Sequence, residues 1–173
     1  MKLVVSDSFN ERLDNNDPTL VNDIANVTIN GGGVARGVTM FNGKLTLNLA
    51  TVTNGKKVDD FISGGVYIAE AASFEMSGGC IQNNESNDYE YTAYAADLYV
   101  QTSATTVATI SGGANVQNVF IEACEGKLTL SEGEIFHVYV EYKESQGASF
   151  EFVQGTVSKL MASKITTGEY QEV

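Results

Sequence analysis

The sequence predicts an all-β protein of the right-handed parallel β-helix class, in which short strands stack in about six coils. Two observations lead to this prediction. A pattern of three brief apolar segments recurs along the chain, and glycines recur at one corner of that pattern. Because no helical periodicity accompanies the pattern, each apolar segment is interpreted as a strand with one buried face.

One copy of the pattern shows its three strands. Gly65-Val66-Tyr67-Ile68 is followed by Ser73-Phe74-Glu75-Met76-Ser77-Gly78-Gly79 and then by Cys80-Ile81-Gln82-Asn83. The first two segments each place two apolar side chains at alternate positions, and the third segment places one. Alternation over three to five residues indicates a strand that buries alternate side chains.

The spacing between copies favours stacked coils over hairpins. It ranges from 19 residues, between Val119 and Val138, to 32 residues, between Val66 and Leu98. The longer intervals contain insertions at one corner, in residues 55–61 and 84–95. A solenoid tolerates corner insertions because they leave the strand ladders intact.

If the coils stack, the inward side chains form columns that together make a narrow core. The first strands contribute two columns, the second strands two more, and the third strands one. The expected columns are Val38, Val66, Leu98, Val119, Val138 and Leu160; Met40, Ile68, Val100, Ile121 and Val140; Leu45, Phe74, Ala108, Leu128 and Phe150; Leu47, Met76, Ile110, Leu130 and Phe152; and Val52, Ile81, Val116, Ile135 and Val157.

Residues 1–33 are expected to form an N-terminal cap with a first strand, and residues 34–173 the β-helix, within one structural domain. Val27–Asn30 is predicted to be a strand followed by a glycine turn. Asp17 and Pro18 suit the N-cap and first turn of a short capping helix that reaches Ile24. A cap is expected because exposed ladder edges invite aggregation.

The composition narrows the classes of partner. The chain has 22 acidic and 10 basic residues, a net charge of −12. Such a surface repels nucleic acid and anionic membranes, and no apolar stretch has the ~20 residues of a membrane-spanning helix, so we expect neither partner. Cys80 and Cys124 match no metal motif and fall on different sides of the expected coils, which predicts two free, mostly buried thiols.

The segment Gly64-Gly65-Val66-Tyr67-Ile68-Ala69, with Ser73-Phe74-Glu75-Met76-Ser77-Gly78-Gly79-Cys80-Ile81-Gln82-Asn83-Asn84 after it, resembles the repeats of large adhesin-like bacterial surface proteins with pectate-lyase-like β-helices. The clear match covers about residues 62–135 and the wider pattern about 34–166. The resemblance implies an extracellular or cell-surface location, as a domain of a longer exported chain. The glycine run is lost before Leu98, Val119 and Val138, and residues 1–30 do not match.

Stacked aromatic side chains are the sharpest candidate binding feature. The central residue of each first strand is expected to face outward, which gives a column of Thr39, Tyr67, Tyr99, Phe120, Tyr139 and Met161. An exposed apolar patch of this kind is typical of a glycan-stacking platform or a partner interface. The alternatives are that the rings only stabilise one another, or that the loop bearing Tyr89, Tyr91 and Tyr94 covers them.

Catalytic and metal-binding groups are sparse. The weak candidates for a cation such as Ca²⁺ are Asp59, Asp60 and Asp97 near the corner loops, and Glu122 with Glu141 at matching places in adjacent coils. Lyases of this fold combine a calcium-binding aspartate cluster with a basic residue, and hydrolases use close aspartates as acid and base, whereas no outward strand position here carries an aspartate pair or an arginine. His137, the single histidine, has no obvious Ser or Asp partner in the sequence. We therefore expect no enzymatic activity and no cofactor.

Three functions remain open. The first is a non-enzymatic module of a bacterial surface or secreted protein, with an adhesion, stalk or glycan-binding role and a glycan or host surface protein as partner. The second is a small carbohydrate-active enzyme or its inactive remnant. The third is a phage or viral fibre segment. Self-association through the solenoid ends or the aromatic face is compatible with each of them.

Overall fold

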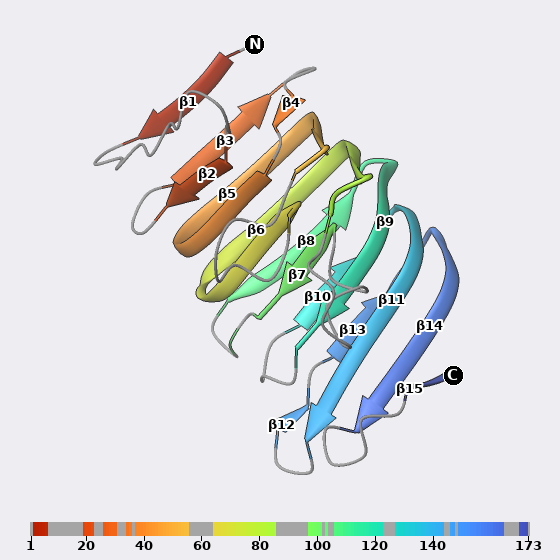
Figure 1. Ribbon diagram of the computed structural model, residues 1–173. Helices are drawn as coiled ribbons and strands as arrows, with labels where there is room; N and C mark the ends of the chain where they lie inside the picture. The colour runs from red at the N-terminus through yellow and green to blue at the C-terminus, as the bar shows by residue number, and fades with distance from the viewer. Residues whose placement is uncertain are drawn as a thin grey trace.

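The computed structural model describes residues 2–6, 19–22, 26–30, 34–35, 37–55, 64–85, 97–101, 103, 106–122, 127–143, 146–147, 149–164 and 170–172. Within these residues the chain is all-β, without helices, and its strands join into one sheet of 15 strands (Figure 1). The strands are β1 (Lys2–Ser6), β2 (Thr19–Asn22), β3 (Asn26–Asn30), β4 (Val34–Ala35), β5 (Gly37–Thr53), β6 (Val66–Gln82), β7 (Leu98–Val100), β8 (Val107–Ser111), β9 (Ala114–Ile121), β10 (Lys127–Leu130), β11 (Gly133–Lys143), β12 (Gln146–Gly147), β13 (Ser149–Phe152), β14 (Thr156–Lys164) and β15 (Tyr170–Glu172).

Most strand pairs are parallel, and their register follows the repeat seen in the sequence. Val38 pairs with Val66, Val66 with Leu98, and Leu98 with Val119. The same line continues from Val119 to Val138 and on to Leu160. The predicted all-β class and parallel pairing are therefore confirmed.

The long strands turn corners without losing their pairing. β6 pairs with β7 through Val66–Ile68, with β8 through Phe74–Ser77 and with β9 through Cys80–Ile81. Figure 1 shows β8, β10 and β13 side by side as one layer, next to the longer β9, β11 and β14. The three short segments of each repeat thus lie on different sides of a shared interior.

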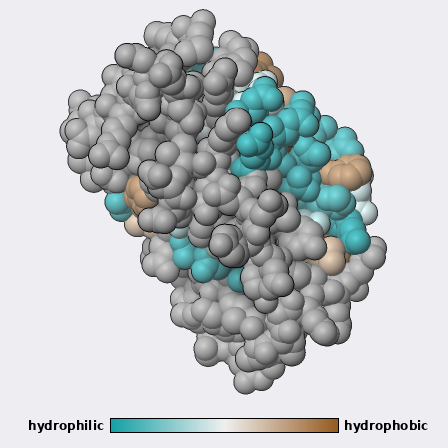
Figure 2. All heavy atoms as spheres, viewed as in Figure 1, coloured by the Kyte–Doolittle hydropathy of each residue, from teal (hydrophilic) through white to brown (hydrophobic). Residues whose placement is uncertain are grey.

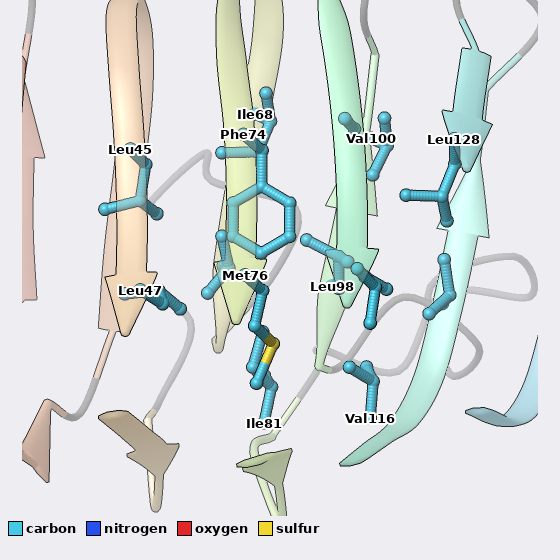
Figure 3. Packing of buried hydrophobic residues seen from close by; sticks show 14 of the residues in the cluster. Leu45, Leu47, Ile68, Phe74, Met76, Ile81, Leu98, Val100, Val116 and Leu128 are labelled. Atoms are coloured by element: carbon cyan, nitrogen blue, oxygen red, sulfur yellow. The ribbon is translucent and has the colours of Figure 1, made fainter. Parts of the chain in front are cut away.

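The interior is filled by the side chains that the alternation predicts. Phe74, Met40, Leu45, Leu47, Ile68 and Met76 are among the largest fully buried side chains. Figure 3 shows Leu45, Phe74, Leu98 and Leu128 pointing into the space between the strands. Only the last predicted members are partly or largely exposed: Val140, Phe150, Phe152, Val157 and Leu160. Phe150 and Phe152 lie on β13, which pairs on one side only, with β10, whereas Val140 lies between β9 and β14.

The expectation of a capping helix is wrong. Thr19–Asn22 is strand β2, and it pairs in parallel with β5 so that Leu20 faces Val38 in the register. β3, the strand predicted at Val27–Asn30, and β4 continue this repeat, with Val27 opposite Leu45 and Ala35 opposite Val52. The three strands β2, β3 and β4 therefore form a further set in register with β5, and this pairing overrides the local helix-start signal of Asp17 and Pro18.

Both ends of the sheet carry an antiparallel strand. β1 pairs antiparallel with β3, from Lys2 opposite Asn30 to Ser6 opposite Asn26. β15 pairs antiparallel with β14, where Met161 faces Glu172. These two strands run opposite to the strands that they pair with, as does the short β12, which pairs antiparallel with the end of β11.

Leu49 has a positive φ of 53° at a corner where the next repeat has Gly78. A side chain in this conformation costs about 1–2 kcal/mol, whereas a flexible glycine loses roughly 0.5–1 kcal/mol of stability through chain entropy. Leu49 is also 60% exposed, so little burial is lost on its removal. We expect Leu49→Gly to raise the free energy of unfolding by about 0.5 kcal/mol in urea titrations. Leu49→Ala keeps the Cβ atom, so a gain of the same size in that variant contradicts this explanation.

Candidate functional site

The aromatic column is buried. Tyr99, Phe120 and Tyr139 are 6%, 3% and 4% exposed, and they form a second apolar cluster with the partly buried Tyr67 and Met161. The ring centroids of Tyr67 and Tyr99 are 5.3 Å apart, and those of Tyr99 and Phe120 are 5.0 Å apart and stacked. The expectation of an exposed platform is therefore wrong for Tyr99, Phe120 and Tyr139, whereas the loop with Tyr89, Tyr91 and Tyr94, the alternative cover, lies outside the described residues.

The hydroxyl groups of this column point to polar partners. The Tyr99 hydroxyl donates to Oε2 of Glu122 over 2.5 Å, and the Tyr67 hydroxyl donates to Oε1 of Gln101 over 2.7 Å. Burial raises the pKa of Tyr99, and the hydrogen bond to Glu122 and the charges of Glu122 and Glu141 raise it further. Glu122 is thus engaged as an acceptor for a buried phenol, which differs from the cation-binding pair proposed for Glu122 and Glu141.

A buried polar cluster lies at the corner between the third and first strands. Asp97 is 1% exposed, and its Oδ1 accepts from the backbone N–H of Asn84 at 3.1 Å and from Asn84 Nδ2 at 3.0 Å. Its Oδ2 accepts from Asn118 Nδ2 at 2.8 Å. Both carboxylate oxygens of Asp97 therefore have amide donors, an arrangement that satisfies the carboxylate without a metal ion.

Asn84 connects three neighbouring segments. Besides its bonds to Asp97, its Nδ2 lies 3.2 Å from the carbonyl oxygens of Val52 and Gln82, and its Oδ1 accepts from the backbone N–H of Gly55 over 2.9 Å. Asn118 extends the cluster in the other direction, since its Oδ1 lies 3.0 Å from Nδ1 of His137. We name Asn84, Asp97, Asn118 and His137 the corner cluster.

Sequence reasoning missed most of the corner cluster. His137 has a partner after all, because Asn118 stands in register with it on the adjacent strand β9. The signal was a polar residue at the end of the third strand in adjacent repeats, at Asn118 and His137, whereas Asn84 lies one position beyond the aligned Asn83. The partners are separated along the chain by a repeat or less, so the relation becomes visible only when the repeats are aligned.

The remaining candidates are placed as follows. Cys80 is a free, partly exposed thiol whose Sγ lies 3.6 Å from Oγ1 of Thr51, so it is less buried than expected. Among the described residues, no group of three or more His, Cys, Asp or Glu side chains is arranged to hold a metal ion. The other candidates lie outside the described residues: Asp59, Asp60, Tyr89, Tyr91, Tyr94 and Cys124.

The outer face of the second strands is polar and exposed. Lys44 pairs with Glu75 at 2.7 Å, and Lys127 pairs with Glu151, which lowers the pKa of Glu151. Each pair joins one repeat to the next, but exposed ion pairs contribute only about 0–1 kcal/mol. Figure 2 shows the molecule from the same direction as Figure 1. The described part of the surface that faces the viewer there is mostly hydrophilic, with small hydrophobic areas.

Comparison of the chain with protein-family models, with curated proteins and with solved structures found no match. The described residues contain no helix that is long and apolar enough to cross a membrane. The geometry of the chain is therefore the basis for inferring its function.

Burial raises the pKa of Asp97 above its ordinary value of 3.8, while the hydrogen bonds from Asn84 and Asn118 oppose this rise. In the pH range between 3.8 and the folded-state pKa, the folded protein holds more protons than the unfolded chain. Stability therefore falls as the pH rises through this range. The measurement is the difference in unfolding free energy between the wild type and Asp97→Asn. We expect this difference to decrease from pH 4 upward and then level off. A difference that grows with pH contradicts the raised pKa.

Proposed function

We propose that the chain is a right-handed parallel β-helix that serves as a non-catalytic stalk module of a bacterial surface or secreted protein. The observation that carries the proposal is the uninterrupted parallel register of the first strands, which runs from Leu20 to Leu160. Right-handedness is inferred because crossovers between parallel strands of one sheet are right-handed in nearly all proteins.

A stacked arrangement of this kind suits a spacer. Figure 1 shows the strands following one another in chain order, with the two termini near opposite ends. Each added repeat extends such a stack by ~4.8 Å, the distance between paired strands. Backbone hydrogen bonds along the axis and a continuous apolar core make the stack stiff, which supports a role in holding two regions apart.

The buried aromatic column favours the stalk role over glycan binding. Sugar rings stack on exposed aromatic faces, whereas Tyr99 and Phe120 use their faces on each other. Rings that stack across repeats add cohesion along the axis, in the way that cross-strand aromatic pairs stabilise sheets. The hydroxyl groups of Tyr67 and Tyr99 also hold the side chains of Gln101 and Glu122 by hydrogen bonds. Ring stacking and these hydrogen bonds are both structural roles.

Spin-label distances test the β-helix. Cysteines replace Thr28, Thr46 or Glu151, outward positions of one ladder, in a chain whose native cysteines are serines. We expect Thr28→Cys with Glu151→Cys to lie about 24 Å apart and Thr46→Cys with Glu151→Cys about 19 Å apart, apart from linker effects, because one repeat separates the two cases. Equal distances in the two pairs contradict the stack.

A glycan array and single-molecule pulling through the termini test the stalk role. We expect stepwise mechanical resistance and no glycan binding by the wild type. Binding that Tyr99→Ala abolishes, while Thr109→Ala keeps it, overturns the stalk role in favour of an adhesive platform. Cleavage of a polysaccharide favours the enzyme, and a stable trimer in light scattering favours a fibre segment.

A further inference from the structure

The corner cluster is a continuous chain of side-chain hydrogen bonds across several repeats. It starts at the backbone of Gly55, passes through Asn84 to the buried Asp97, and continues through Asn118 to the partly exposed His137. It joins a buried carboxylate to the single histidine of the chain. The first three links have a defined donor and acceptor, whereas the direction of the last, between Asn118 and His137, depends on the imidazole tautomer.

The ionised carboxylate of Asp97 only accepts hydrogen bonds. Its Oδ2 faces Nδ2 of Asn118, so the amide of Asn118 is oriented with its oxygen toward His137. That oxygen is also only an acceptor, and the atom 3.0 Å away is Nδ1 of His137. The bond therefore forms only if Nδ1 carries a hydrogen atom.

We infer that Asp97, acting through Asn118, holds neutral His137 as its Nδ1–H tautomer, which leaves Nε2 as the acceptor nitrogen of the ring. A carboxylate or carbonyl that binds one ring nitrogen commonly sets the function of the other. Asp97 and Asn118 are positioning residues in this arrangement, because they fix the orientation and tautomer of the imidazole.

The surroundings of His137 agree with a positioned ring. Phe136 lies edge-on to the imidazole with centroids 4.7 Å apart, and the Tyr139 ring lies 6.0 Å away. Lys159 on β14 is the charged residue in register with His137. Among the described residues, burial is the largest influence on the pKa of Asp97, and the hydrogen bonds from Asn84 and Asn118 oppose it.

Long-range ¹H–¹⁵N NMR of the imidazole tests the inference, because the single histidine gives one unambiguous pair of ring nitrogens. The measurement is made well above neutral pH, where free imidazole is uncharged. We expect the wild type to show the Nδ1–H tautomer. In Asp97→Asn, the new amide keeps an acceptor for Asn84 and turns a donor toward Asn118, so Asn118 reverses and the Nε2–H tautomer replaces the Nδ1–H form.

Two further variants separate this relay from general disturbance. Glu75→Gln removes an exposed carboxylate paired with Lys44 and should leave the tautomer unchanged. Asn118→Ala removes the link, and we expect a mixture of the two tautomers. An Nε2–H wild type overturns the inference, as does a folded Asp97→Asn that keeps Nδ1–H. If Asp97→Asn does not fold, a pure Nδ1–H form in Asn118→Ala overturns the inference instead.

Discussion

Gly79→Ala should destabilise the protein by about 3 kcal/mol, the sum of a conformational and a steric cost. Gly79 has a φ of 82°, a region in which a side chain costs about 1–2 kcal/mol. A Cβ atom there would also overlap the carbonyl oxygen and backbone nitrogen of Ala50 on the neighbouring repeat. Because both contacts are backbone, relief requires the two repeats to move apart. Guanidinium unfolding monitored by circular dichroism measures the loss.

Gly113→Ala is the matched control. Gly113 has a similar φ of 70°, but a Cβ atom there would have no heavy atom within 4 Å. Only the conformational cost remains, so we expect a loss of about 1 kcal/mol. Equal losses in the two variants would show that the close approach of the repeats at Gly79 has no energetic weight.

Phe74→Ala should cost about 3–5 kcal/mol of unfolding free energy, the range for truncating a buried aromatic ring. Phe74 is fully buried and stands in register between Leu45 of one repeat and Ala108 of the next. The small side chain of Ala108 leaves the space that the ring of Phe74 occupies. Thermal and denaturant unfolding should both show the loss.

A size exchange tests this account of the core. Combining Phe74→Ala with Ala108→Phe moves the ring by one repeat and conserves the volume, so we expect it to recover part of the lost stability. Phe152→Ala provides a comparison, because Phe152 occupies an inward column but is 53% exposed, and we expect a loss of about 1 kcal/mol there. A full loss at Phe152, or no recovery in the exchange, contradicts the packing described for Phe74.

The all-β class and the parallel pairing could be predicted from the sequence because strand alternation is a local signal. Alternating apolar residues predict each strand within a few positions, as Val66 with Ile68 and Phe74 with Met76 do. The equivalent residues of the other repeats then predict the register between strands. The first repeat was missed because Leu20 and Ala35 belong to shorter strands, and Asp17-Pro18 imitates a helix start. Pairing with β5 decided the structure of that segment, and such pairing is not encoded within it.

The candidate site was harder to predict because it depends on side-chain surroundings. Tyr99 was correctly placed in a column with Tyr67 and Phe120, but alternation cannot distinguish an exposed outer face from one that is covered. Asp97 was noted as an acid near a loop, whereas its role depends on Asn84, from the preceding repeat, and on Asn118, which is 21 residues away in the chain. Only three-dimensional proximity reveals these partners.

The strands β1 and β15 have a consequence for polymerisation. A second molecule that continued the stack would have to offer strands of the same polarity, since successive repeats pair in parallel. At β3 and at Met161–Ser163 of β14 that position is already taken by a segment running the opposite way. Fibre growth by simple end-on addition is therefore hindered at these ladders, as in natural sheets whose edges are protected from unwanted pairing.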